Sequence, residues 1–315
     1  MSDATADEST THTPRSGWEE VTTQLRRNST SRWGMYIVLF IIVVAIWAFV
    51  DGVVLDYYFA ERFWSSPITA PPGSRGLLPP VGITNEYGTG TWAHPLGTDH
   101  RGRDILVRLV YGSRIAIQIG IVATGVGATL GTIIGAVSGY YGGWIDDVLQ
   151  RTVETFYAIP FIVLMIAIMS AFGRGLWIAI VGVSVITTPI FARLIRSEVL
   201  SVREEEYIEA AKAAGVRDRN IIRRHVIPNS LAPVLVQATL QIGVNILIVA
   251  ALSFLGFGAQ PPTPSWGAML AQSRTYMLPD PWFSVWPGLA ILVTVVGFNL
   301  VGDGLRDAFD PRLND

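Results

Sequence analysis

Long apolar runs separated by shorter polar segments dominate the chain. A helix needs about 20 mostly apolar residues to cross a bilayer, and the runs predict six such helices, with five to seven compatible with the pattern. The first run carries Asp51 near its end, and the fourth is short and contains Pro189. The predicted spans are 35–55, 115–138, 155–173, 176–192, 231–254 and 283–302. The chain is therefore expected to be an all-α integral membrane protein.

The composition agrees with that class and excludes several kinds of functional site. Half of the 315 residues are apolar, only 15% are charged, and there is no cysteine; disulfides, thiolate metal sites and cysteine nucleophiles are thus excluded. The phosphate-binding pattern G-x-x-x-x-G-K-[ST] is absent, as are the H-E-x-x-H and G-x-S-x-G motifs of hydrolases. We expect no catalytic residue, no metal and no cofactor, and no nucleic-acid partner, only a multi-pass protein in contact with lipid in the cell membrane.

The apolar runs also divide the chain and suggest its orientation. With an inside N-terminus, 15 of the 23 Lys and Arg residues lie on the inner side, as the positive-inside rule requires. The cluster formed by Arg101, Arg103, Arg108 and Arg114 runs against the rule, but loops near 60 residues obey it poorly. Both termini are predicted to be cytoplasmic. The predicted divisions are a tail 1–34, the first helix 35–55, an extracytoplasmic loop 56–114, a five-helix core 115–302 and a tail 303–315.

Two local patterns have a structural interpretation. Glycines recur every four residues in the second span, which allows close helix packing in lipid; they are Gly127, Gly131, Gly135 and Gly139. Charges gather just before that span, at Asp99, Arg101, Arg103 and Asp104. They could form a substrate or ion site, but a structural cluster of ion pairs is the favoured interpretation.

The segment 193–229 is the largest predicted inner loop. Strong helix formers fill 204–214, Gly215 ends that run, and a second helix is expected from Asp218 to just before Pro228. Three apolar residues can face the bundle, and four charged ones can face solvent or a partner. The first set is Ile208, Ala211 and Ile222; the second is Glu204, Glu205, Arg219 and Arg223. Periodicity alone leaves a solvated loop, a lipid contact and a docking element equally open.

Motif spacing narrows that choice. The sequence E-A-A at 209–211, a glycine four residues later and H-V-I-P-N at 225–229 resemble the EAA loop of ATP-binding-cassette importer permeases. His225 departs from the isoleucine of the broader pattern. In that family the loop carries a coupling helix that docks on a cytoplasmic ATPase, so the resemblance implies this role here. The implied coupling residues are Glu209, Ala210, Ala211, Gly215, His225, Pro228 and Asn229.

The resemblance extends over about 30–312. The stretches HPLGTDHRGRDILVRLVYGSRIAI, GYYGGWIDDVLQR, SFLGFGAQPPTPSWGAML and GDGLRDAFDPR are similar to the dipeptide/oligopeptide/nickel permease subfamily, and the single N-terminal span followed by a long loop is similar to its C-type member. This implies a type I importer permease fold without enzymatic activity and favours di- or oligopeptides as substrates, although neither spacing nor charge in the sequence separates peptides from nickel or sugars. Implied partners are a second permease, two ATPases that bind the ATP, and an extracytoplasmic substrate-binding protein.

Other functions have weaker support in the sequence. A gradient-driven transporter or channel usually needs ionisable residues inside its spans, and the predicted interiors hold none except Asp51 at an edge. A membrane scaffold without transport activity is a weaker third hypothesis.

The fifth span carries an amide stripe at Gln237, Gln241 and Asn245, where each four-residue step rotates by only about 40°. Such a stripe must face protein or water. From the residues, hydrogen bonds to a neighbouring helix are favoured; the family resemblance instead favours a lining of the translocation path.

Overall fold

The computed structural model describes residues 28–309. Within that range, five helices are long and apolar enough to cross a membrane, and a bent helix pair brings the number to six if it is counted as one span. The all-α membrane fold predicted from the sequence is therefore confirmed. The five long helices are α2 (Ser29–Phe49), α4 (Ile105–Tyr141), α7 (Leu176–Val202), α11 (Leu231–Phe254) and α13 (Trp282–Phe309).

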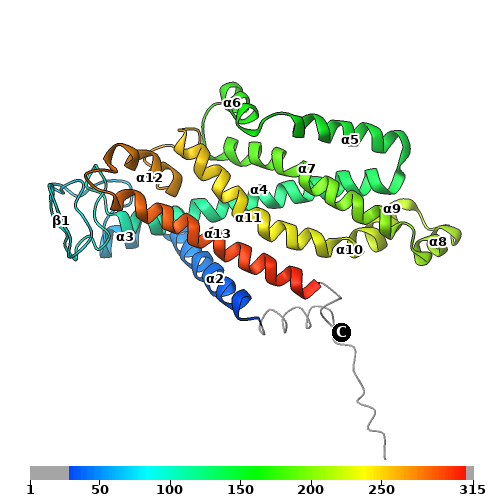
Figure 1. Cartoon of the computed structure of the whole chain (residues 1–315), viewed down its shortest axis with the longest axis horizontal. Coiled ribbons are helices and arrows are strands. Elements are labelled where there is room, and N and C mark those ends of the chain that lie inside the picture. Colours follow the sequence, from blue (N-terminus) through cyan, green and yellow to red (C-terminus); the bar gives the residue numbers. More distant parts are fainter. Residues whose placement is uncertain (1–27, 310–315) are drawn as a thin grey trace, which may run out of the picture.

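The shorter elements gather at the two ends of the bundle (Figure 1). One end, here called the loop end, has η1 (Val50–Val54), α3 (Tyr58–Phe63), the antiparallel pair β1 (Thr84–Asn85) and β2 (Gly88–Thr89), α12 (Trp266–Ser273) and η3 (Arg274–Tyr276). The opposite end, here called the helix-pair end, has α8 (Glu206–Ala213), α9 (Asp218–Ile221), η2 (Ile222–Val226) and α10 (Ile227–Asn229).

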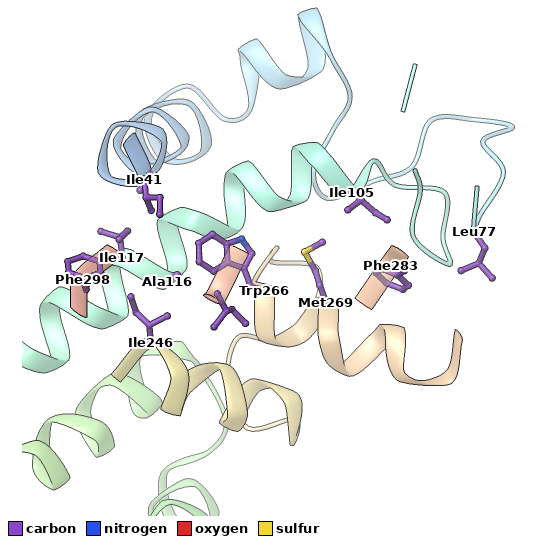
Figure 2. Packing of buried hydrophobic residues seen from close by; sticks show 12 residues of the cluster. Ile41, Leu77, Ile105, Ala116, Ile117, Ile246, Trp266, Met269, Phe283 and Phe298 are labelled. Atoms are coloured by element: carbon purple, nitrogen blue, oxygen red, sulfur yellow. The ribbon is translucent and has the colours of Figure 1, made fainter. Parts of the chain in front are cut away.

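The core of the loop-end half joins four helices that are far apart in the sequence. Figure 2 shows Ile41 of α2, Ile117 of α4, Ile246 of α11 and Phe298 of α13 approaching one another, with Trp266 of α12 among them. The Trp266 indole also donates a 2.9 Å hydrogen bond to the Leu109 carbonyl of α4. Helix α12 is thereby fastened to the long helix that runs through the whole bundle.

The glycine ladder lets α4 and α7 approach closely. A β-carbon built at Gly131 would lie 2.5 Å from Phe191 Cβ, and one at Gly135 would lie 2.4 Å from the Ala192 carbonyl oxygen. Both are shorter than any normal contact, so a larger residue would push the two helices apart. In lipid, packing of this kind holds helices together because no hydrophobic drive acts between them. The predicted close packing is confirmed.

The predicted span over 155–173 is not one continuous helix. This part of the chain forms α5 (Gly143–Ala158) and α6 (Phe161–Phe172), which meet at 91°. The bend follows from Pro160, because a residue before proline avoids the helical region, and Ile159 is extended with φ −81° and ψ 125°. The 12 residues of α6 extend only about 18 Å, less than the roughly 30 Å of a hydrocarbon core.

Helix ends also differ from the apolar runs. Helix α4 begins ten residues before the predicted position 115, because Asp104 caps it by accepting a 3.0 Å hydrogen bond from the Val107 amide. Helix α7 continues to Val202, so 193–202 of the predicted loop is helical. The predicted tails lie mostly outside the described residues, but 29–34 and 303–309 belong to helices. Hydropathy detects the part of a helix that suits lipid, whereas caps and packing decide where it ends.

Candidate functional site: the helix pair between α7 and α11

The helix pair is fastened to the bundle by an apolar cluster. Ile208 of α8, Ile221 of α9 and Val226 of η2 are fully buried against Ile195 and Val199 of α7. Ala211 and Ile222 pack at the edge of this cluster, as expected from the sequence, and the four charged residues expected at the surface are exposed. Ile221 and Val226, the best buried residues of the second half, were not predicted. The helix pair is therefore packed firmly against α7 and is not attached to the bundle only through its two chain ends.

The turn between α8 and α9 depends on Gly215. Its φ is +74°, a conformation that residues with a β-carbon resist. Its amide donates to the Lys212 carbonyl at 3.0 Å and the next amide, of Val216, donates to the Ala211 carbonyl at 3.1 Å. These two bonds form a Schellman motif, in which a left-handed residue closes a helix and satisfies its last carbonyls. The predicted break at this glycine is confirmed.

The second helix does not stop before Pro228 as predicted. After α9 the chain forms the π-helix η2, and the Pro-containing helix α10 follows η2 directly. Proline is tolerated in the first turn of a helix because its missing N–H needs no partner there. Asn229 then donates from Nδ2 to the His225 carbonyl at 2.7 Å and to the Tyr207 hydroxyl at 3.2 Å. Asn229 thus ties the end of the second helix back to α8.

A polar contact adds to the apolar one. The hydroxyl of Tyr140, at the end of α4, donates to Asp218 Oδ1 at 2.8 Å, and the Lys212 ammonium lies 5.4 Å from the centre of the same ring. Tyr140 therefore touches both helices of the pair. Sequence reasoning missed it, because Asp218 is 78 residues away along the chain and no local pattern links the two.

The outer surface of α8 is open and polar. Five of its residues line a shallow depression: Glu206, Glu209, Ala210, Lys212 and Ala213. Among the predicted coupling residues, Ala211 and His225 are half-buried, whereas Glu209, Ala210, Gly215, Pro228 and Asn229 are exposed. Within residues 28–309 no three His, Cys, Asp or Glu side chains gather as a metal site requires. This arrangement suits contact with another protein and offers no chemistry of its own.

Comparison with known proteins identifies the family. The sequence profile of the family described as "Binding-protein-dependent transport system inner membrane component" matches residues 131–315. The chain belongs to this family. It is the non-catalytic permease subunit of an ATP-binding-cassette importer, and the relatives give no support to a gradient-driven transporter.

Relatives of this permease match it over nearly its whole length. The dipeptide transport system permease protein DppC of Alkalihalophilus pseudofirmus is 41% identical over 302 residues, covering 96% of this chain and 92% of the relative. The glutathione transport system permease protein GsiD of Pectobacterium atrosepticum is 38% identical over 300 residues, covering 95% and 92%.

A solved structure of the MetNI methionine ABC transporter in an inward-facing conformation contains a chain with a similar fold. The TM-score is 0.55 at 22% identity, and the match covers 65% of this permease and 98% of that chain. This likeness supports the type I permease fold predicted from the sequence.

The amide stripe lies inside the permease. Asn245 is fully buried and accepts hydrogen bonds from Gln241 at 3.0 Å and from Thr187 of α7 at 3.2 Å; it donates to Thr124 of α4 at 2.9 Å. Gln241 is also buried, while Gln237 is half-buried beside α13. The bonds of Asn245 to Thr187 and Thr124 are the interhelical bonds of the first hypothesis, whereas the bond from Gln241 lies within α11. The second, that the stripe lines the translocation path, stays a prediction.

The charged segment before α4 is a closed network. Asp99 Oδ2 accepts a 2.7 Å hydrogen bond from Arg103 Nε and lies 3.6 Å from Arg108 Nε. Arg108 also donates to the Pro67 carbonyl at 2.8 Å, and Arg103 to Gln272 of α12 at 3.1 Å. The three charged residues are at most 2% exposed. The geometry agrees with the interpretation as a structural cluster of ion pairs that joins the loop end to α4 and α12.

Proposed function

We propose that this permease transports short peptides. The observation that carries the proposal is its similarity, over almost the whole chain, to permeases named for a dipeptide and for glutathione. Glutathione is itself built from three amino acids, so the two named substrates share a small, amide-linked, zwitterionic character. A common substrate class among relatives this similar supports the same class here.

The complete importer would contain a second permease, two ATPases and an extracytoplasmic binding protein. We assign the ATPase contact to the helix pair, with Glu209, Ala210 and the Gly215 turn at the contact. Support comes from the exposed polar surface of α8 beside a fully buried apolar anchor. Because Ile208 and Tyr140 connect the pair to α7 and α4, closure of the ATPases on ATP would move these helices as rigid elements and switch the direction in which the path opens.

Transport is tested by reconstitution. The four kinds of subunit are placed in proteoliposomes with ATP on the ATPase side, and uptake of radiolabelled dialanine is compared with uptake of alanine and of glutathione. ATP-dependent, binding-protein-dependent uptake of dialanine is expected, with alanine excluded. Uptake of alanine alone, or of none of the three, would contradict the proposal.

The proposed orientation puts the helix-pair end and both termini in the cytoplasm. The absence of cysteine makes single-cysteine labelling clean. Thr84→Cys and Arg217→Cys are matched, because both side chains are exposed at opposite ends of the bundle. In intact cells an impermeant maleimide should label position 84 and spare position 217, and the reverse result would overturn the orientation.

A further inference from the structure

One face of α5 carries polar side chains that belong neither to the helix pair nor to the amide stripe. Asp146, Gln150 and Glu154 follow at four-residue steps, and Tyr157 lies three residues further. Residues so spaced share one side of a helix, and this side turns toward α7. Together with Asp147 and Arg151 of α5 and Arg193 and Arg196 of α7, the three polar residues line a cleft.

The cleft lies close to the apolar region of the bundle. Arg193 follows 17 residues after the start of α7 at Leu176, which is about 26 Å along a helix, against a hydrocarbon thickness of about 30 Å. Arg193 therefore lies toward the end of α7 that leads to the helix pair, at the edge of the apolar region and not in its middle. In transport proteins, ionisable side chains next to or within a membrane span commonly mark the route of a substrate.

Part of the cleft is already paired. Arg196 forms a bidentate pair with Asp146, with N–O distances of 2.7 and 2.5 Å, and Ser138 of α4 also donates to Asp146. This group makes a fixed floor that joins α4, α5 and α7. Bidentate pairing of this kind is the strong form of an ion pair, so Asp146 and Arg196 serve the fold.

The other charges of the cleft are free. Asp147, Arg151 and Glu154 are exposed and make no ion pair with any residue of the described range. The Arg193 guanidinium lies 4.0 Å from the centre of the Tyr157 ring, a contact that orients the cation without neutralising it. The cleft thus offers two free carboxylates and two free guanidinium groups side by side.

We infer that this cleft contacts the transported peptide, with Glu154 receiving its ammonium group and Arg193 its carboxylate. The inference rests on the proposed peptide transport and names a site for it. The cleft has a volume of about 490 Å³, within the roughly 300–1,000 Å³ of ligand pockets. The lining residues Asp147 and Glu154 are about 10 Å apart along α5, so the cleft is long enough for a peptide of two or three residues, which extends about 7–10 Å.

The mixture of charges favours a zwitterion over an anionic lipid headgroup. A headgroup site needs cations, and carboxylates beside them would weaken it. Peptide termini need both signs. The two ligands therefore predict opposite effects when a carboxylate of the cleft is neutralised.

The test uses the complete importer in proteoliposomes, with dialanine delivered by its binding protein at a subsaturating concentration. Glu154→Gln and Arg193→Gln are each expected to slow uptake about tenfold, the usual scale for one lost charge-assisted contact. Glu198→Gln is the acidic control, because Glu198 lies on α7 outside the cleft and makes no hydrogen bond or ion pair with a described residue. Arg174→Gln is the basic control, since it also removes a guanidinium over a ring, that of Phe257 at 5.1 Å. Both controls should transport normally.

A second readout does not depend on turnover. Gln150→Cys puts a single thiol of this subunit at the middle of the cleft, and dialanine should slow its modification by a charged maleimide in the purified complex held in nanodiscs. Co-purification with the partner subunits checks that every variant assembles.

The outcomes separate the alternatives. If dialanine uptake is normal in both cleft variants and position 150 is not protected, the inference fails while the proposed function stands. If Arg193→Gln slows uptake but Glu154→Gln accelerates it, and vesicles rich in phosphatidylglycerol protect position 150, the ligand is a lipid headgroup and the inference is overturned. If the unmodified importer takes up no peptide, the proposed function fails and the inference with it.

Discussion

The ion network at the loop end and the cleft between α5 and α7 both contain aspartates and arginines, yet they differ in burial and pairing. In the network, Asp99 is fully buried and lies within ion-pair distance of both Arg103 and Arg108. In the cleft, Glu154 and Arg151 are exposed and unpaired within the described part of the chain. Buried charges must be paired to be tolerated, whereas exposed charges beside a membrane region remain free to meet a ligand.

The comparison teaches that charge alone does not indicate function in this permease. Along the sequence the network residues lie within 99–108, whereas the cleft residues are divided between 146–154 and 193–196. The denser group, the ion network, holds the loop end together. The cleft between α5 and α7 is less conspicuous in the sequence, but its charges are exposed.

The largest effect is expected from breaking the network. Asp99→Asn leaves Arg103 and Arg108 buried without a counter-ion, which costs about 3 kcal/mol of the free energy of unfolding. Thermal unfolding of the purified complex in detergent, together with its yield, measures this loss. Glu154→Gln is the matched control and should change stability by less than about 0.5 kcal/mol, because exposed groups contribute little. Equal stability of the two variants would refute the distinction between the two regions.

Neutralising a second buried carboxylate, that of Asp280, should raise the stability of the permease instead of lowering it. Asp280 precedes α13, is 1% exposed, and neither of its oxygens has a hydrogen-bond partner of normal geometry within residues 28–309. Burial raises the pKa of Asp280 from 3.8 to about 6, and the backbone N–H of Trp282 offsets only part of this effect.

Because its folded pKa lies above the unfolded value, the stabilisation due to protonated Asp280 is complete below about pH 4 and is lost as the pH rises through about 6. Asp280→Asn should therefore stabilise the complex at pH 7 by about 2 kcal/mol. It should also flatten the dependence of the unfolding temperature on pH between those values. Destabilisation at pH 7 would mean that Asp280 has a partner outside this chain.

A third prediction tests whether exposed groups at the helix-pair end act on a partner. Gly215→Asp introduces about 1 kcal/mol of backbone strain, and we expect the protein to insert into the membrane but to lose ATP-driven uptake as the turn loosens. Gly73→Asp is a matched control, since Gly73 has nearly the same φ, +75°, and equally open surroundings at the other end. Normal uptake and normal co-purification of the ATPases with Gly215→Asp would contradict the coupling role.

The smallest effect on stability is expected in the amide stripe. Gln241→Leu removes a hydrogen bond to Asn245 within α11, and its effect should not exceed the roughly 0.6 kcal/mol that an interhelical hydrogen bond contributes on average in membranes. If the stripe lines the path, uptake or the range of accepted peptides changes while assembly with the second permease is retained. Loss of assembly would assign the stripe to packing, in agreement with the buried hydrogen bonds of Asn245.

Much of the fold could be predicted because it depends on local patterns. Apolar runs identify spans, the four-residue glycine repeat predicts the close approach of α4 and α7, and Gly215 marks the turn of the helix pair. The break at Pro160 is also a local feature, but the apolar residues on both sides of this proline favoured the prediction of a single span. The residue pattern of the EAA loop carried the family assignment.

Tertiary structure decided which polar residues are buried and paired and which are exposed and unpaired. The sequence does not show that Tyr140 bonds to Asp218, that Asn245 forms hydrogen bonds to α4 and α7, or that the charges of α5 turn toward Arg193. Lipid selects strongly for apolar surface, so the sequence alone determined five of the six predicted spans and the class of this permease. Partners of buried polar groups lie tens of residues away on other helices, and only the packing of those helices determines whether a charge is paired.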